Sequence, residues 1–365
     1  MKSHAQRPDV LIVAAVVLLL ALGVVTVMSA ASVTDLLQYN DPYYHVKRQL
    51  VWAVLGVIAM TVLARVDYRL LRALTLPALA GAFLLLVLVL FVGSAAGGAR
   101  RWLGFGFISV QPSEVAKLAL VMYTAAYVAQ RRNDMHRFFS GLLPPLVITG
   151  AACLLILLEP DFGTAAMIAL IVVVMLYAGG ASPGQLLAVG VAAAPLAAYL
   201  IVSEPYRLRR LLAFVDPWAD RMDSGWNVVQ SLLAIGSGGL FGLGLGESRQ
   251  KYLYVPEQHT DFIFAILGEE LGFVGTTTVL LLFALLGWRG LRAAMRAPDM
   301  YGTMLAVGIT AMIVLQAFVN IGVVTGSLPT TGITLPFISV GGSSLVVTMA
   351  GVGVLLNISS QGTKV

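Results

Sequence analysis

Long runs of apolar residues alternate with short polar connections along almost the whole chain. Runs of about 17 to 25 apolar residues are typical of helices that span a bilayer. We predict ten spanning helices, over residues 10–32, 49–64, 73–93, 114–130, 141–158, 162–180, 185–203, 262–287, 301–322 and 340–358. An even number of spans places both termini on one side of the membrane. The pattern therefore predicts an all-α polytopic membrane protein, with a single integral membrane domain over residues 1–365.

The composition excludes a soluble globular protein. Hydrophobic residues make up 59% of the sequence and charged residues only 11%, whereas charged residues are about a quarter of an ordinary soluble domain. The one cysteine, Cys153, lies inside a predicted span, so the sequence offers neither a disulfide nor a cysteine metal cluster.

The basic residues of the short connections favour one orientation in the membrane. With the N-terminus in the cytoplasm, the inner face carries twelve Lys and Arg residues and the short outer connections carry five. The sequence thus predicts an N-in, C-in topology, in which the one long connection, about 203–260, is extracytoplasmic. Its apolar stretches 211–215 and 228–235 are too short to span and are predicted to be interfacial or re-entrant helices.

The most informative polar residues come just before the predicted span 262–287. Glu257, His259 and Asp261 fall within five residues. A short side chain at position 260 or 261 is suited to cap the following helix. A carboxylate beside a histidine at the mouth of a spanning helix is equally suited to proton transfer. The two interpretations are compatible.

Further ionisable residues are predicted within the bilayer. Glu269 and Glu270 lie about 12 Å deeper than Asp261 if the helix is continuous. Glu114 and Lys117 share one face of the span 114–130 at a spacing of three residues. Each set is either a functional site or a buried structural ion pair.

The outer face is also rich in arginine and lysine. The long connection alone carries Arg207, Arg209, Arg210, Arg221, Arg249 and Lys251. Such groups suit the oxygens of a lipid-linked phosphate, although attraction to anionic headgroups explains them equally well. Arg101 and Trp102 pair a guanidinium with a flat ring, which suits either a phosphorylated sugar or an interfacial aromatic belt.

Two other patterns exclude site classes. The glycines between Gly236 and Gly246 have dinucleotide-like spacing, but the strand and crossover helix that such a site requires are missing. The histidines are too scattered for a zinc cluster. No resident cofactor is certain, and no nucleic-acid partner is expected.

A series of short motifs, in order along the chain, resembles the SEDS family (shape, elongation, division and sporulation proteins). The motifs are Met28–Ser32, Lys47-Arg48-Gln49, Arg101-Trp102-Leu103 with Gln111–Glu114, Glu159–Thr164, Asp216-Pro217, Pro256–Ala265, Glu269–Gly272, and Leu335–Ser339 with Gly341–Ser344. Residues 242–248, with Lys251 and Tyr254, resemble the division branch (FtsW) more than the elongation branch (RodA). Val255 stands where leucine is usual, and the sporulation branch stays open.

The resemblance implies a ten-helix protein of the bacterial plasma membrane that polymerises lipid II, the undecaprenyl-pyrophosphate disaccharide pentapeptide, outside the cell. It implies that Asp261 is the essential acid and that Trp102, Glu114 and Lys117 match positions tied to activity or cavity structure. It further implies a class B penicillin-binding protein as transpeptidase partner, together with other division or elongation proteins.

A mechanism follows as a hypothesis. Asp261 removes the proton from a sugar 4-hydroxyl, and basic groups stabilise the departing pyrophosphate. The candidates for that second role are Arg48, Arg101, Lys117 and Arg210, or a divalent cation such as Mg²⁺ or Mn²⁺. Glu257, His259, Trp102 and Glu114 complete the predicted substrate-binding set. The rival functions are a lipid II flippase or other transporter, against which the missing inverted repeat argues, and a noncatalytic scaffold.

Overall fold

The computed structural model describes residues 8–96, 99–105, 108–220, 225–251 and 259–362. Ten long helices dominate it, and each coincides with a predicted span. They are α1 (Val10–Tyr39), α2 (Tyr44–Arg65), α3 (Tyr68–Val92), α4 (Pro112–Gln130), α5 (Leu143–Leu158), α6 (Phe162–Ala178), α7 (Pro183–Val202), α10 (Ile263–Arg296), α11 (Met300–Val324) and α12 (Gly342–Ser360). A π-helical turn, Phe138–Leu142, leads into α5, and a 3-10 turn, Arg132–Asp134, follows α4.

Within the described residues, eight of these helices are long and apolar enough to cross a bilayer, α5 being counted together with the π-helical turn before it. The other two are α6, which has 17 residues, and α4, which carries Glu114 and Lys117. Several predicted helices are too short at one end, because the observed helices continue beyond their apolar runs. Helix α1 extends to Tyr39 rather than 32, and α10 extends to Arg296 rather than 287.

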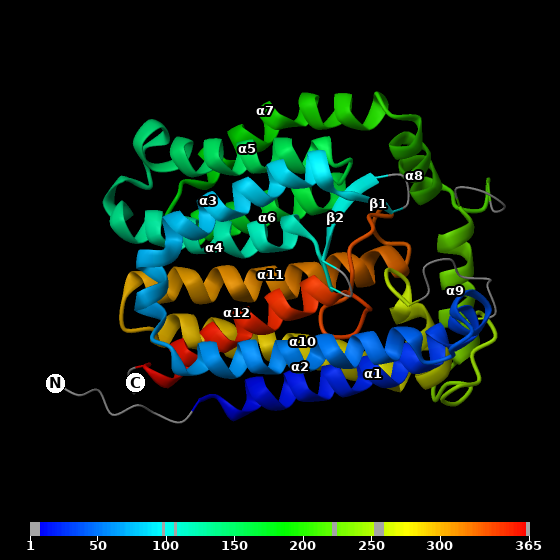
Figure 1. Ribbon diagram of the computed structural model, residues 1–365. Coiled ribbons are helices and arrows are strands. Elements are labelled where there is room, and N and C mark those ends of the chain that lie inside the picture. The colour runs from blue at the N-terminus through cyan, green and yellow to red at the C-terminus, as the bar shows by residue number, and fades with distance from the viewer. Residues whose placement is uncertain (1–7, 97–98, 106–107, 221–224, 252–258, 363–365) are drawn as a thin grey trace.

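The helices run side by side, so the bundle has two ends (Figure 1). Both described termini lie at one end, which we call the terminal end, as an even number of spans requires. It is closed by polar contacts: Asp9 pairs with Arg289, and the hydroxyl of Tyr68 donates to Asp299 at 2.6 Å. The opposite, loop-rich end holds residues 40–43, 159–161 and 325–341 and the two short helices α8 (Pro205–Val215) and α9 (Trp226–Gly238).

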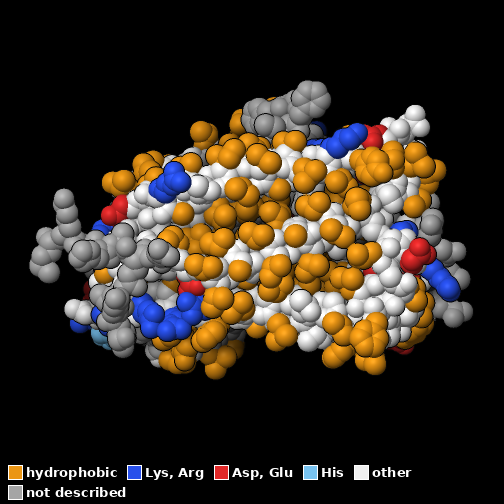
Figure 2. Space-filling model, turned by 90° about the horizontal axis from the view of Figure 1, so that it is seen from below, with side chains coloured by type: hydrophobic (Ala, Val, Ile, Leu, Met, Phe, Trp, Pro, Cys, Tyr) orange, Lys and Arg blue, Asp and Glu red, His pale blue; other side chains and the backbone are white. Residues whose placement is uncertain are grey.

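Side chains on the outside of the bundle match a lipid environment. Figure 2 shows one face on which hydrophobic side chains cover the middle, while Lys and Arg gather toward the two ends. Helix α7 is the most peripheral, with Leu187, Val191 and Leu196 all more than 60% exposed. Apolar side chains at this density have no partner in water, so the surface indicates an integral membrane protein.

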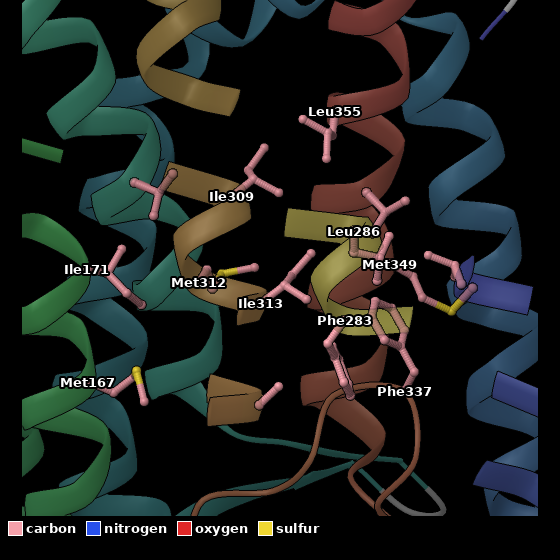
Figure 3. Packing of buried hydrophobic residues seen from close by; sticks show 14 of the residues in the cluster. Met167, Ile171, Phe283, Leu286, Ile309, Met312, Ile313, Phe337, Met349 and Leu355 are labelled. Atoms are coloured by element: carbon pink, nitrogen blue, oxygen red, sulfur yellow. The ribbon is translucent and has the colours of Figure 1, made fainter. Parts of the chain in front are cut away.

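Helix α11 lies at the centre of the bundle and packs against α4, α6, α10 and α12. Figure 3 shows the core around it. The labelled side chains come from α6 (Met167, Ile171), α10 (Phe283, Leu286), α11 (Ile309, Met312, Ile313), α12 (Met349, Leu355) and the α11–α12 loop (Phe337). Phe337 is buried although it lies in a loop, so this loop is packed into the core and does not lie on the surface.

A small antiparallel sheet at the loop-rich end was not predicted. It consists of β1 (Ser94–Ala96), β2 (Ala99–Phe105) and β3 (Ile108–Val110), in the order β1-β2-β3. Leu103 pairs with Val110. The glycine-rich sequence around it has no alternation of apolar and polar residues, so the sequence does not predict strands there.

Helix α10 is broken at Gly272, which the prediction of a continuous helix missed. Gly272 adopts φ 66° and ψ −160°. The glycine-rich chain after α9 fills the break: the amides of Phe273 and Val274 donate to the carbonyls of Gly239 and Leu240 at 2.9 and 3.1 Å. Gly238 and Gly242 therefore serve close backbone packing, because a Cβ at either position would lie about 2 Å from a backbone oxygen of α10.

We expect Gly272→Ala to destabilise the protein. A Cβ at this position would lie 2.3 Å from the backbone nitrogen of Gly242, and the conformation itself costs a residue with a side chain about 1–3 kcal/mol. Gly236→Ala in α9 is the matched control, because a Cβ there meets nothing within 4 Å. Thermal unfolding in detergent should show a lower midpoint for Gly272→Ala alone. Equal midpoints for the two variants would contradict this account.

Candidate active site

A pocket of about 260 Å³ opens at the loop-rich end, beside the start of α10. Its walls come from α8, α9, the turn before α10, α11 and the α11–α12 loop. The lining residues are Tyr206, Arg209, Arg210, Asn227, Asp261, Phe262, Val323, Thr330, Thr331, Gly332 and Ile333. The predicted acid, Asp261, thus faces a cavity of a size suited to a small polar group.

The segment 259–261 is held in place through its backbone. The amide of Val340 donates to the carbonyl of His259 at 3.0 Å, and the Ser339 hydroxyl donates to that of Thr260 at 2.6 Å. The Asn320 side chain of α11 donates to the carbonyl of Asp261 at 2.8 Å. Three consecutive carbonyls are therefore fixed by α11 and the loop that follows it, and Asp261 lines the pocket.

The helix-capping interpretation of residues 260 and 261 is wrong. Helix α10 begins at Ile263, and its N-cap residue is Phe262. The turn over residues 259–262 separates the two polar side chains from the capping position. The reason is the backbone anchoring just described, which holds the chain in a turn before the helix starts.

Arginines of α8 form the basic wall of the pocket. Arg210 lies over the ring of Tyr206 at 4.3 Å and donates to the carbonyl of Thr330 at 3.4 Å. Arg209 lines the same pocket. Arg207 instead contacts the carbonyl of Leu200 at 2.7 Å, at the end of α7. Only two of the three arginines therefore line the pocket with Asp261, and the sequence alone could not show which.

Glu114 and Lys117 form a buried ion pair next to the pocket. The Lys117 ammonium lies 2.8 Å from Glu114 and donates to the Gln316 amide oxygen at 2.7 Å. Gln316 in turn donates to the carbonyl of Thr334 at 3.0 Å. Because Thr334 follows the pocket residues Gly332 and Ile333, the pair supports the loop that forms the pocket wall, and neither member lines the pocket itself.

The two glutamates of α10 are buried and separately bound. Glu269 accepts the amides of Arg249 and Gln250 at 3.0 and 3.3 Å and the hydroxyl of Ser248. Glu270 accepts the hydroxyl of Ser29 on α1. Both therefore fasten neighbouring segments to the first part of α10. These contacts are hydrogen bonds from amides and hydroxyls, and neither glutamate is among the pocket-lining residues.

Arg101 and Trp102 lie in β2, away from the pocket lining. The Arg101 guanidinium donates to the carbonyls of Glu159, at 2.9 Å, and Pro160. The half-buried Trp102 pairs with Ser94 of β1. The guanidinium thus ties the small sheet to the α5–α6 connection, and the predicted substrate contact of both residues stays a prediction.

Glu159 itself gives a pH-dependent expectation. Its side chain is 1% exposed, and burial, reinforced by Asp161, raises its pKa to about 8 from its usual value of 4.5. Between pH 4.5 and pH 8, Glu159 loses its proton in the unfolded chain but keeps it in the folded protein. The free energy of unfolding therefore falls as the pH rises through this range.

Glu159→Gln keeps this side chain neutral at every pH. We expect the variant to unfold at a higher temperature than the wild type at pH 8, and at the same temperature at pH 4.5. Thermal unfolding at the two pH values measures the difference. An advantage of equal size at both would show that the carboxyl is not the titrating group.

His259 and Arg48 belong to a second cluster, formed at the α1–α2 turn. The His259 ring lies 4.5 Å from that of His45, and Arg48 donates to the Tyr44 hydroxyl at 3.1 Å. The predicted site residues therefore divide: Asp261 and Arg210 line the pocket, and the other described ones do not. Glu257 lies outside the described residues.

Sequence reasoning missed the uncharged part of the site. Thr330 and Thr331 line the pocket, and Asn320, near the C-terminal end of the apolar helix α11, binds the carbonyl of the acid. The amide of Asn320 was the one available signal, since a polar residue in a spanning helix requires a partner. The threonines have no such signal, because they follow α11 in an ordinary connection.

Proteins of known sequence and structure resemble this chain over nearly its whole length. A family model described as cell cycle protein, FtsW/RodA/SpoVE, matches residues 9–364. Stage V sporulation protein E of Bacillus subtilis is 45% identical, with 98% of this chain and 99% of that protein covered. The probable peptidoglycan glycosyltransferase FtsW of Geobacter sulfurreducens is also 45% identical, over 98% and 96%.

Two solved structures share the fold. The first, described as structural coordination of polymerization and crosslinking by a peptidoglycan synthase complex, has 33% identity and a TM-score of 0.80, over 96% of this chain and 97% of that one. The second is the rod shape determining protein RodA of Thermus thermophilus, with 32% identity, a TM-score of 0.72 and 98% of both chains covered.

Fold and site together define a polytopic helical membrane protein with an acid and two arginines in a pocket at one end of its bundle. The chain belongs to the FtsW/RodA/SpoVE family of cell cycle proteins. This confirms the resemblance to the SEDS family.

Proposed function

We propose that the protein is a peptidoglycan glycosyltransferase that polymerises lipid II into glycan strands. The observation that carries the proposal is the pocket in which Asp261 faces Arg209 and Arg210. Such a pocket combines a proton acceptor with cationic donors for a phosphorylated leaving group. The relatives named probable peptidoglycan glycosyltransferase FtsW, which are 40–45% identical, support this activity.

In the proposed reaction, Asp261 accepts the proton of the 4-hydroxyl of one lipid II. That oxygen forms a bond to the anomeric carbon of a growing chain, and the bond from this carbon to the pyrophosphate breaks. The anomeric centre is inverted. Arg209 and Arg210 face the position where negative charge develops on the pyrophosphate, which is where donors lower the barrier.

A divalent cation stays a proposal. Asp261 is the one carboxylate among the described pocket residues. Mg²⁺ commonly uses one or two carboxylates and takes further oxygens from substrate phosphates, so Asp261 fits as its protein ligand. Such an ion would add positive charge at the pyrophosphate.

The distribution of basic residues supports a proposed location for the reaction. The loop-rich end carries the pocket, and the terminal end carries most of the arginines of the short connections, such as Arg65, Arg132 and Arg292. By the positive-inside rule the terminal end is cytoplasmic. The proposed active site is therefore on the outer face of the bacterial plasma membrane, with an N-in, C-in chain.

A class B penicillin-binding protein is the proposed partner. The supporting observation is the likeness to a structure described as a peptidoglycan synthase complex that coordinates polymerization and crosslinking. We assign the protein to cell division, because the FtsW proteins are 40–45% identical and the RodA structure only 32%. The equal identity to the sporulation protein keeps that branch as an alternative.

Purified protein in detergent with labelled lipid II tests the proposal. Glycan polymer is the expected product. Movement of lipid II across reconstituted vesicles without polymer would instead establish a flippase. If the protein produced neither polymer nor transport, a noncatalytic scaffold would be the remaining function.

We expect Arg210→Gln to weaken the use of lipid II about 10- to 100-fold in kcat/KM. A hydrogen bond to a charged group contributes about 1.5–3 kcal/mol, which corresponds to that range. Arg207→Gln is the matched control on the same helix, because Arg207 contacts Leu200 and does not line the pocket. A loss of equal size in both variants would contradict the assignment of Arg210 to the substrate.

A further inference from the structure

A buried acid–imidazole pair lies on the side of the segment 259–261 that faces α1 and α2. Asp35, in the last turns of α1, is 0% exposed. One of its carboxylate oxygens accepts the backbone amide of His45 at 2.8 Å, and the other contacts Nδ1 of the same residue. Burying a carboxylate is costly unless it is well bonded. These two contacts therefore fix both the backbone and the ring of His45.

The orientation of the His45 ring is further restricted by its aromatic neighbours. Tyr39 and Tyr44 meet it edge-on, with centroid distances of 5.8 and 5.2 Å, and they stack on each other at 3.8 Å. The His259 ring packs against it at 4.5 Å. The His45 ring is therefore held by residues of α1 and α2, and its position limits where the His259 ring can pack.

His259 is two residues from Asp261, and the two sides of this segment are held differently. Helix α11 and the α11–α12 loop bind the backbone carbonyls of residues 259–261. Helix α2 contacts the side chain of His259 through the ring of His45, which Asp35 of α1 holds in place. The ring contact thus adds a point of attachment on the side of the turn opposite its backbone bonds.

We infer that Asp35 and His45 are positioning residues for the reaction: acting through the His259 ring, they fix the direction in which Asp261 points into the pocket. This inference rests on the proposed function and names a part of the site that does not line the pocket. Reacting groups lose much of their effect when displaced by about 1 Å. A loss of positioning should therefore lower kcat and leave the KM for lipid II unchanged.

The test uses Asp35→Asn, with Asp41→Asn as the matched control. Asp41 lies in the neighbouring α1–α2 turn and pairs with the exposed Lys47 at 2.7 Å. Because the chain has only four histidines, histidine-labelled protein gives a separate readout by NMR. We expect Asp35→Asn to shift the His259 resonances, to leave those of His136 unchanged, and to lower kcat about 10- to 100-fold. Asp41→Asn should change neither.

A double substitution shows whether the effect passes through His259. Asp35→Asn should cause no further loss of kcat in protein that already carries His259→Ala, whereas a general structural defect would add to it. If Asp35→Asn does not fold, the pair Asp35→Leu with His45→Ala removes the ring contact and leaves no stranded buried charge. The same loss of kcat is expected.

The outcomes separate this inference from the proposed function. Unchanged His259 resonances in folded Asp35→Asn protein would overturn the inference whatever the activity. Shifted resonances with a normal kcat, or a change in KM alone, would overturn it as well. Wild-type protein that makes no glycan polymer would overturn the proposed function, and the inference with it.

Discussion

Asp261→Asn is expected to lower polymerisation of lipid II by about 10²- to 10⁴-fold, the contribution typical of a well-placed general base. The amide has the shape of the carboxylate but cannot accept the proton. The backbone bonds from Asn320 and to the neighbouring carbonyls do not involve the side chain, so the fold should persist. Measurement requires purified protein, labelled lipid II and separation of glycan polymer from substrate.

Glu204→Gln is the matched control for this substitution. Glu204 is an exposed acid at the start of α8, near the pocket, but it does not line it and makes no capping hydrogen bond. Its variant should polymerise normally. Equal losses in the two variants, or full activity of Asp261→Asn, would remove Asp261 from the role of base.

Lys117→Met is expected to destabilise the protein by about 3–5 kcal/mol, because it leaves Glu114 as a buried charge without its partner. Glu114 and Lys117 are 6% and 3% exposed, so water cannot replace the lost ion pair. The thermal unfolding midpoint in detergent, together with the yield of folded protein, measures the effect.

The double variant Glu114→Gln with Lys117→Met separates charge from structure. Removing both charges strands neither, so most of the lost stability should return. Activity of the folded double variant then tests the predicted role of the pair in the site. Low activity with restored stability would show that the contact through Gln316 to Thr334 matters for the pocket wall. Failure of the double variant to recover stability would contradict the ion-pair account.

The ten long helices could be predicted because a helix that spans a bilayer requires a long apolar run, which is visible in the local sequence. Asp261 was predictable for the opposite reason: a carboxylate at the mouth of a spanning helix is rare and requires an explanation. The break at Gly272 was not predictable, because it depends on chain between α9 and α10 that returns to fill it. Local composition does not contain such a contact.

The division of the predicted site residues also depended on tertiary structure. Arg209, Arg210 and Arg207 are close in sequence, yet two face the pocket and one faces α7. Their assignment depends on how α8 is rotated, which is set by packing against α7 and the α11–α12 loop. The contact of His259 with His45 joins positions 214 residues apart, and the sequence gives no sign of it.

The most direct test of the central claim is a structure of Asp261→Asn protein with lipid II bound. We predict that the pyrophosphate lies against Arg209 and Arg210 and that the substituted side chain faces a sugar hydroxyl in the same pocket. Pyrophosphate bound instead at Arg48 or Arg101, with the pocket empty, would contradict the account.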